Sequence, residues 1–187
     1  MAIEEPKYKV TENSEEFELR TYSPKIVAEA LVSGSLDEAS SAGFKLIANY
    51  IFGNNTSRMG GNEKISMTAP VVMQPKSEKI SMTAPVSMEQ TGGQWRVQFV
   101  MPSQYTLDTL PKPNNPAVTL REVPAGNYAV IRFSGFAGED KTAIKTAELM
   151  AWLVSKGITP TGKPELARYN PPWTLPFMRR NEVLVAY

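Results

Sequence analysis

The 187-residue sequence contains no cysteine and no histidine. Without cysteine, the chain can form no disulfide bond, no thiolate zinc site and no cysteine nucleophile. Without histidine, it lacks the side chain that serves most often as general base and as metal ligand. Hydrolytic triads that pair serine or cysteine with histidine are therefore excluded.

The sequence also lacks a strong charge of either sign. It has 20 basic and 19 acidic residues, a formal net charge of +1, and the basic residues are scattered. Such a balance creates no general field for nucleic acid or an anionic membrane. No run approaches the roughly 20 apolar residues of a membrane span, and the first residues do not resemble a signal peptide. We therefore predict a cytoplasmic protein with no nucleic-acid partner and no membrane span.

Catalytic patterns are equally scarce. There is no phosphate-binding loop and no zinc-ligand spacing. The acidic pairs Glu15-Glu16 and Glu139-Asp140 lie in polar or helix-start positions, where solvent and the helix dipole explain them. The sequence thus predicts that the protein is not an enzyme.

A nine-residue motif is present twice. The segment Glu63–Val71 returns letter for letter as Glu78–Val86. Apolar side chains alternate in both copies, which is typical of strands. Pairing Ile65 with Val86 and Val71 with Ile80 would place every apolar residue opposite another apolar one, so we predict a hairpin connected by residues 74–77.

The first part of the chain shows two alternating strands followed by a helix. The strands are predicted at Phe17–Tyr22 and Lys25–Ser33. Ser35 and Glu38 form a capping-box pattern at the helix start, and Gly53 suits its end. The residues expected to form the buried face of this helix are Ala39, Gly43, Leu46, Ile47 and Tyr50. Later elements are a strand over 95–101 and a proline-rich linker over 106–116.

The second part of the chain echoes the first. Leu19-Arg20 is matched 101 residues later by Leu120-Arg121, and Ser33-Gly34 is matched at the same shift by Ser134-Gly135. A helix is again expected next, over residues 139–156, and Gly157 should stop it. Its predicted buried face comprises Ile144, Ala147, Ala151 and Val154. Strands should follow at 165–169 and 182–187.

These elements predict a single α+β domain over residues 1–187. It would consist of two pseudo-symmetric strand-strand-helix-strand repeats, about 8–105 and 117–187. Their sheets would join into a curved surface or distorted β-barrel, with two helices packed against it.

Four motifs together resemble the SOUL or haem-binding protein family. They are Ser66–Val71 with its copy, Phe99–Pro102, Tyr169–Pro172 and Arg179–Glu182, and they occur in the family's order along almost the whole chain. The resemblance implies a distorted β-barrel flanked by two helices, similar to bacterial gyrase-inhibitor and effector-binding domains. It also implies non-covalent binding of haem or another tetrapyrrole in a shallow hydrophobic groove.

The resemblance implies a set of site residues. Basic side chains would meet the propionates, and apolar or methionine side chains would meet the porphyrin plane. The candidate residues, drawn from the first helix, the segment before the first motif copy and the proline-aromatic loop, are Leu46, Arg58, Met59, Lys64, Met67, Trp173, Phe177 and Arg179. A histidine ligand to iron, one feature proposed for the family, is absent here, which leaves Met, Tyr, Lys, water or no ligand.

Other interpretations of the same residues stay open. Met67 could belong to the core, because methionine often fills gaps there. One of Arg179 and Arg180 could form an ion pair with Glu182 or Glu165. The protein could instead be an effector-binding module for hydrophobic or cationic small molecules, for which Glu29 or Glu122 would supply an acid. It could also be an interaction domain that uses its Pro-Pro-Trp loop.

Overall fold

The computed structural model describes residues 4–76, 94–171 and 173–187. The helices are α1 (Leu36–Ile51), α2 (Glu139–Ser155) and the 3-10 turn η1 (Pro176–Met178). The strands are β1 (Tyr8–Ser14), β2 (Phe17–Tyr22), β3 (Lys25–Ser33), β4 (Asn55–Thr56), β5 (Val71–Lys76), β6 (Gln94–Val100), β7 (Lys112–Pro113), β8 (Val118–Val123), β9 (Gly126–Phe133), β10 (Glu165–Arg168) and β11 (Asn181–Ala186).

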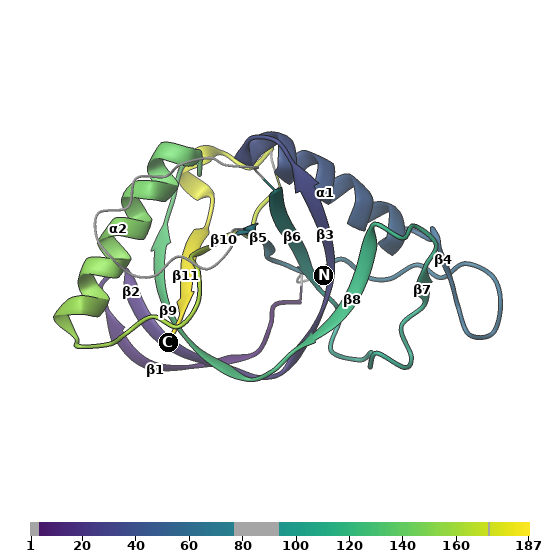
Figure 1. Ribbon diagram of the computed structural model, residues 1–187, viewed down its shortest axis with the longest axis horizontal. Helices are drawn as coiled ribbons and strands as arrows, with labels where there is room; N and C mark the ends of the chain where they lie inside the picture. Colours follow the sequence, from purple (N-terminus) through teal and green to yellow (C-terminus); the bar gives the residue numbers. More distant parts are fainter. Residues whose placement is uncertain (1–3, 77–93, 172) are drawn as a thin grey trace.

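Nine of the strands form one antiparallel sheet in the order β1-β2-β9-β11-β10-β5-β6-β3-β8. The sheet curves strongly, and both helices lie on its outer face (Figure 1). Within the described residues, β1 and β8 are its two edges and do not pair with each other. The α+β class is confirmed, but the expected barrel is wrong: the sheet is open, because no described strand joins its edges.

The strand order is the same when read from either side of the β10–β5 pair. The strands of the first unit are β2, β3, β5 and β6, and those of the second unit are β8, β9, β10 and β11. Apart from β1, one half of the sheet reads β10, β11, β9, β2 from its centre outward, and the other half reads β5, β6, β3, β8. The first strand of each unit therefore pairs with the second strand of the other unit: β2 pairs with β9, and β8 pairs with β3. The bounds of β2 and β8 also differ by the 101 residues seen in the sequence. This order agrees with the predicted repeats.

Helix α1 follows the sequence prediction closely. Ser35 and Glu38 form the capping box, and Gly53 lies just beyond the helix end with a φ of +119°. The predicted face is buried except for half-buried Leu46, which packs against the core. At Gly43 the helix comes so near to β6 that an added Cβ would lie 2.5 Å from the Val97 side chain. The absence of a side chain at this position permits the close packing.

Helix α2 packs against β9 and β11, but not through the predicted face. Ile144, Ala147, Ala151 and Val154 are all exposed, and Leu149 and Leu153 are the fully buried residues. The side chain of Trp152 is stacked on Phe17 of β2 at a centroid distance of 5.0 Å. The prediction failed because two apolar stripes compete on this helix, and only the bulkier one fills the space above the sheet. None of the described helices is long and apolar enough to cross a membrane.

The first copy of the repeated motif is less regular than predicted. Ile65 and Ala69 are buried, but a continuous strand begins only at Val71, and it includes residues 74–76 that were expected to form a connection. Pro70 has no N–H to donate to a neighbouring strand, which explains the late start. Strand β5 then pairs with β6 and β10. The second motif copy and the predicted hairpin partners lie outside the described residues.

The inner face of the sheet carries a polar cluster. Arg20 and Glu182 are both fully buried and form a bidentate pair, with distances of 2.7 and 3.0 Å. Tyr169 donates a hydrogen bond to Glu182 at 2.7 Å, and Arg20 donates one to the Tyr22 hydroxyl at 3.0 Å. Burial raises the pKa of Tyr22 to about 12. The pair is thus enclosed by hydrogen bonds, as a buried ion pair requires.

Candidate functional site

The connection between β10 and β11 exposes an unusual amount of apolar surface. Trp173 is 82 % exposed, Phe177 73 %, and Phe136, in the neighbouring loop before α2, 65 %. Leu175 and Met178 are also exposed. We call these five residues the aromatic surface.

Hydrogen bonds hold the two loops of the aromatic surface in place. The Gly135 amide donates to the Pro176 carbonyl at 2.8 Å, and the Asn181 side chain donates to the Gly135 carbonyl at 3.0 Å. Thr174 N–H closes a turn on the Pro171 carbonyl at 3.0 Å. The backbone that carries the exposed apolar side chains is therefore held in place by hydrogen bonds.

A groove of about 540 Å³ lies beside the aromatic surface. We call it the cationic groove; its charged lining residues are Arg132, Lys141, Lys145, Arg179, Arg180 and the single acid Glu16. The Arg179 guanidinium lies 4.9 Å from the Phe136 ring, so the groove and the aromatic surface meet at this residue.

The groove cations differ in how they are held. Lys145 bridges Glu16 and Glu148 at 3.1 and 2.7 Å. Burial by itself would lower the pKa of Lys145, but these carboxylates outweigh it and raise the pKa. Lys141 donates to the Ser134 carbonyl at 2.7 Å, and Arg179 donates through Nε to the Thr174 carbonyl at 2.8 Å. Lys141 and Arg179 thus each donate a hydrogen bond to a backbone carbonyl oxygen.

Arg180 has the structural role that the sequence left open. Its side chain pairs with Glu182 at 2.9 Å and with Glu5 at 3.0 Å. Burial would lower the pKa of Arg180, but Glu182 outweighs this effect and the pKa is raised. One member of the Arg179-Arg180 pair therefore anchors the sheet, while the other faces the aromatic surface.

The predicted site residues fall into two groups. Trp173, Phe177 and Arg179 lie near the start of α1, since Arg168 at the end of β10 pairs with Asp37 at 2.9 Å. The residues of the second group follow the end of α1 or lie near it: Leu46, Arg58, Met59, Lys64 and Met67. A helix of 16 residues is about 24 Å long, so the two groups are separated by most of the length of α1 (Figure 1).

The second group forms a more open arrangement. Met59 is 99 % exposed, and Lys64 is also exposed. Arg58 contacts Asp108 at 3.4 Å. Leu46 and Met67 are half-buried, and Leu46 packs against the core. Sequence reasoning did not identify Arg132, Phe136, Lys141 and Lys145; the i, i+4 spacing of the two lysines was the available signal.

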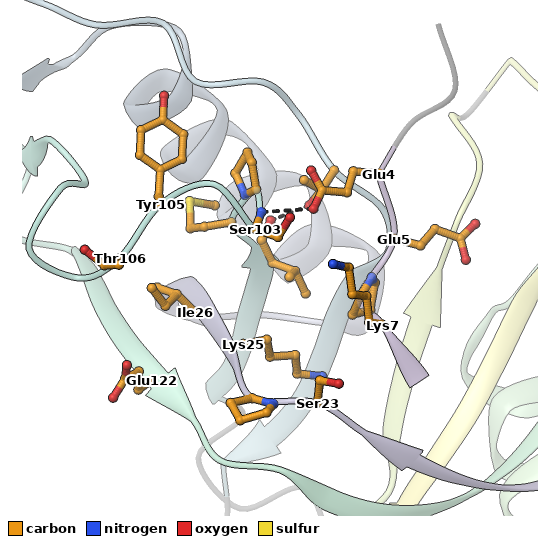
Figure 2. A pocket seen from close by; sticks show the side chains of 16 residues that line it. Glu4, Glu5, Lys7, Ser23, Lys25, Ile26, Ser103, Tyr105, Thr106 and Glu122 are labelled. Atoms are coloured by element: carbon orange, nitrogen blue, oxygen red, sulfur yellow. Dashed lines mark hydrogen bonds between the residues drawn. The ribbon is translucent and has the colours of Figure 1, made fainter. Parts of the chain in front are cut away.

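A smaller cavity of about 240 Å³ lies between the N-terminal segment and the β2–β3 turn. Figure 2 shows Glu4 and Lys7 on one side of it and Glu122 on the other. Hydrogen bonds from the Ser103 side chain and, at 2.9 Å, from the Ser103 amide lower the pKa of Glu4. Ile26 and Met101 contribute apolar lining. Glu122, one of the acids considered for an effector site, thus lines a cavity near the edge strand β8.

The central acid of the inner sheet face is Glu165, on β10. Burial raises the pKa of Glu165, an effect opposed by the charges of Lys25, Arg121 and Arg96. Burial has the opposite effect on the pKa of a base and lowers the pKa of Lys25. The Lys25 ammonium lies 4.8 Å from the Tyr22 ring centre. Glu29, the other acid considered from the sequence, is paired with Arg121 at 3.2 Å. Sequence reasoning missed Glu165 because one acid in a short strand carries no distinguishing pattern.

Comparison with family models decides the relationship of the chain. The model for the SOUL heme-binding protein matches residues 3–186, nearly the whole sequence. The chain belongs to the SOUL haem-binding family. A search of the curated proteins found no match.

Solved structures similar to this SOUL-family chain share its fold. The C-terminal domain of EcmrR superposes with a TM-score of 0.66 at 11 % identity, covering 96 % of each chain. An EcmrR–DNA complex gives a TM-score of 0.63 at 13 % identity, covering 90 % of this chain and 56 % of that one. A structure described as a hydrolase from Listeria innocua gives 0.60 at 12 % identity, covering 94 % and 93 %. At these identities the likeness concerns the fold alone.

The SOUL-family assignment raises the question of whether these residues suit a tetrapyrrole. Such a ligand needs apolar area for its macrocycle and cations for its carboxylates. The aromatic surface and the cationic groove provide both, side by side. No three acidic side chains in the described ranges converge so as to hold a metal ion.

Proposed function

We propose that the protein binds a tetrapyrrole, haem or porphyrin, non-covalently and serves as a cytoplasmic buffer or carrier rather than as an enzyme. The observation that carries this proposal is the contact of Arg179 with Phe136, which joins an exposed aromatic surface to a groove with five cations. The family assignment supports the same ligand class.

In this proposal the ligand lies against the aromatic surface with its carboxylates in the cationic groove. Trp173, Phe177 and Phe136 would cover part of the macrocycle. Arg179 and Lys141 would meet the carboxylates, because Arg179 lies where the groove meets the aromatic surface and Lys141 lines the same groove. With no histidine in the chain, binding does not depend on an iron–imidazole bond. A bound haem would bring its own redox chemistry.

The test is a spectroscopic titration with hemin and, in parallel, with metal-free protoporphyrin. We expect saturable binding of both, since the site contacts the macrocycle and its carboxylates. Each of Trp173→Ala and Phe177→Ala should weaken binding about tenfold, the value of one buried aromatic contact. No spectral response to either compound at tens of micromolar would refute tetrapyrrole binding.

The control variants for Trp173→Ala and Phe177→Ala are Arg58→Ala and Met59→Ala, near the other end of α1. We expect both to bind like the wild type. If they lose binding while Trp173→Ala does not, the ligand lies at the second group of predicted residues instead. Loss of hemin binding alone in Met59→Ala would identify Met59 as an iron ligand.

A second candidate function is supported by Glu165. Glu165 is a half-buried acid on the central strand β10, and the Lys25 ammonium that acts on it already lies over the rings of Tyr22 and Tyr128, so this place is suited to a lipophilic cation. We propose this effector-binding role as the alternative. It would be tested by titrating tetraphenylphosphonium into the wild type and Glu165→Gln. Binding that strengthens with pH and is lost in the variant supports it, and equal binding to both proteins refutes it.

A further inference from the structure

We propose that the aromatic surface and the cationic groove together form a docking surface for an anionic lipid bilayer. This proposal goes beyond tetrapyrrole binding and does not require it, because it concerns the ligand-free protein. It rests on where the chain concentrates its exposed apolar side chains and its cations.

The apolar part of the argument is the exposure of five large side chains on two adjacent short loops. Their exposed fractions run from 55 % for Leu175 to 82 % for Trp173. Burying one such side chain fully is worth about 1.5–3 kcal/mol. A contiguous apolar patch rimmed by charge marks an interaction site. Hydrogen bonds hold the backbone of the two loops that carry these side chains in place.

The electrostatic part of the argument is the position of the cations directly beside this patch. Arg132, Lys141, Lys145, Arg179 and Arg180 line the groove, and the acids paired with them include Glu16 and Glu148 for Lys145 and Glu5 and Glu182 for Arg180. Each Lys or Arg near an anionic bilayer contributes about 1 kcal/mol of attraction. The net charge of the whole chain is only +1, so this local excess is invisible in the composition.

The shape favours a bilayer over a protein partner. The apolar side chains stand on loops and project outward, whereas the depression beside them is lined by charge. An amphipathic partner helix would need an apolar groove to receive it, and a partner strand would need an exposed sheet edge. Projecting Trp, Phe and Leu side chains with cations behind them match the layered interface of a membrane, where rings enter at the headgroup level.

The experiment measures co-sedimentation of the full chain, free of tetrapyrrole, with phosphatidylcholine vesicles and with vesicles containing phosphatidylserine. We expect binding to the anionic vesicles alone, and its loss when salt is raised to about 1 M, where screening shortens to about 3 Å. Emission of Trp173 should shift to the blue on binding. This shift should be absent in Trp173→Phe, which retains half-buried Trp95 and Trp152.

Matched variants separate docking from general effects. Phe177→Ser and Lys141→Glu should each weaken vesicle binding about tenfold or more, through a lost apolar contact and a reversed charge. The controls are Val154→Ser, which is 76 % exposed at the far end of α2, and Lys112→Glu in β7. Both should bind like the wild type.

Several results would overturn the proposal. These are no binding to anionic vesicles at low salt, equal binding to neutral vesicles, or equal losses in the variants and their controls. If the surface binds an acidic protein rather than a bilayer, we expect no binding to anionic vesicles at low salt. Hemin titration without lipid is read separately, so failure of docking and failure of tetrapyrrole binding are distinguishable.

Discussion

Arg20 and Arg121 occupy equivalent places in the two halves of the sheet, yet their surroundings differ. Arg20 is fully buried against Glu182, whereas the Arg121 side chain is 43 % exposed beside Glu29. The difference arises at the sheet edges. Strand β1 pairs with β2 and places the Tyr8 ring 4.3 Å from the Arg20 guanidinium, while β8 is an edge within the described residues. The additional strand β1 therefore accounts for the burial of the Arg20 ion pair, whereas the Arg121 ion pair stays partly exposed.

The covered pair should be worth far more to stability than the open one. Replacing Glu182 by Gln removes the buried bidentate partner of Arg20 and leaves it only the ion pair with Glu18 at 2.6 Å, and we expect a loss of about 3–5 kcal/mol in the free energy of unfolding. Glu29→Gln removes the partly exposed pair and should cost less than about 1 kcal/mol. Urea denaturation followed by tryptophan fluorescence measures both. Similar losses in the two variants would contradict the comparison.

The two helices differ in how closely they approach the sheet. Gly43→Ala would force a Cβ to within 2.5 Å of Val97, and α2 contains no glycine. We expect this change to cost about 1–3 kcal/mol, although alanine favours a helix by about 1 kcal/mol. Thermal unfolding reports the loss. The double variant Gly43→Ala/Val97→Ala should recover part of it, and no recovery would place the strain elsewhere.

The inner face also holds two acids that should respond oppositely to pH. The pKa of Glu182 is lowered: burial would raise it, but the hydrogen bond and charge of Arg20, the charge of Arg180 and the hydrogen bond from Tyr169 together outweigh burial. The stability that Glu182 contributes is therefore present above its unfolded pKa and is lost as pH falls through the lower folded value. Burial raises the pKa of Glu165, so its effect is favourable below the unfolded pKa and is lost as pH rises through the folded value.

Glu165→Gln should consequently gain stability relative to the wild type as pH rises, by about 1.4 kcal/mol for each unit of pKa shift that it removes. Unfolding free energies of both proteins between about pH 4 and pH 8 check this expectation. A difference that stays constant across this range would show that Glu165 does not titrate there. A gain would also agree with the ligand-binding alternative, because binding sites often reduce stability.

The sequence patterns that proved correct are local ones. Strand alternation located β2 and β3, and the pair Ser35 and Glu38 located the start of α1. Where two apolar stripes shared one helix, as in α2, periodicity could not choose between them. Leu149 and Leu153 became the buried face because the sheet offers space for bulky side chains there.

Only part of the candidate site was accessible from the sequence. Trp173, Phe177 and Arg179 were proposed through the family resemblance, which implies a role for the proline-aromatic loop and the segment after it. Their association with Phe136 and Lys141 could not be read from the chain. It depends on the contact between Gly135 and Pro176, which are 41 positions apart in the sequence.

By itself, the sequence determined the elements with local signals: the two-strand openings of each repeat, the capped first helix, the family motifs and the exclusion of histidine chemistry. Tertiary structure decided which faces are buried, that the sheet stays open, and that the predicted site residues divide between the two ends of α1. The physical reason is distance along the chain. Hydrogen-bond patterns and caps act over a few residues, whereas burial and charge depend on side chains that meet only after folding.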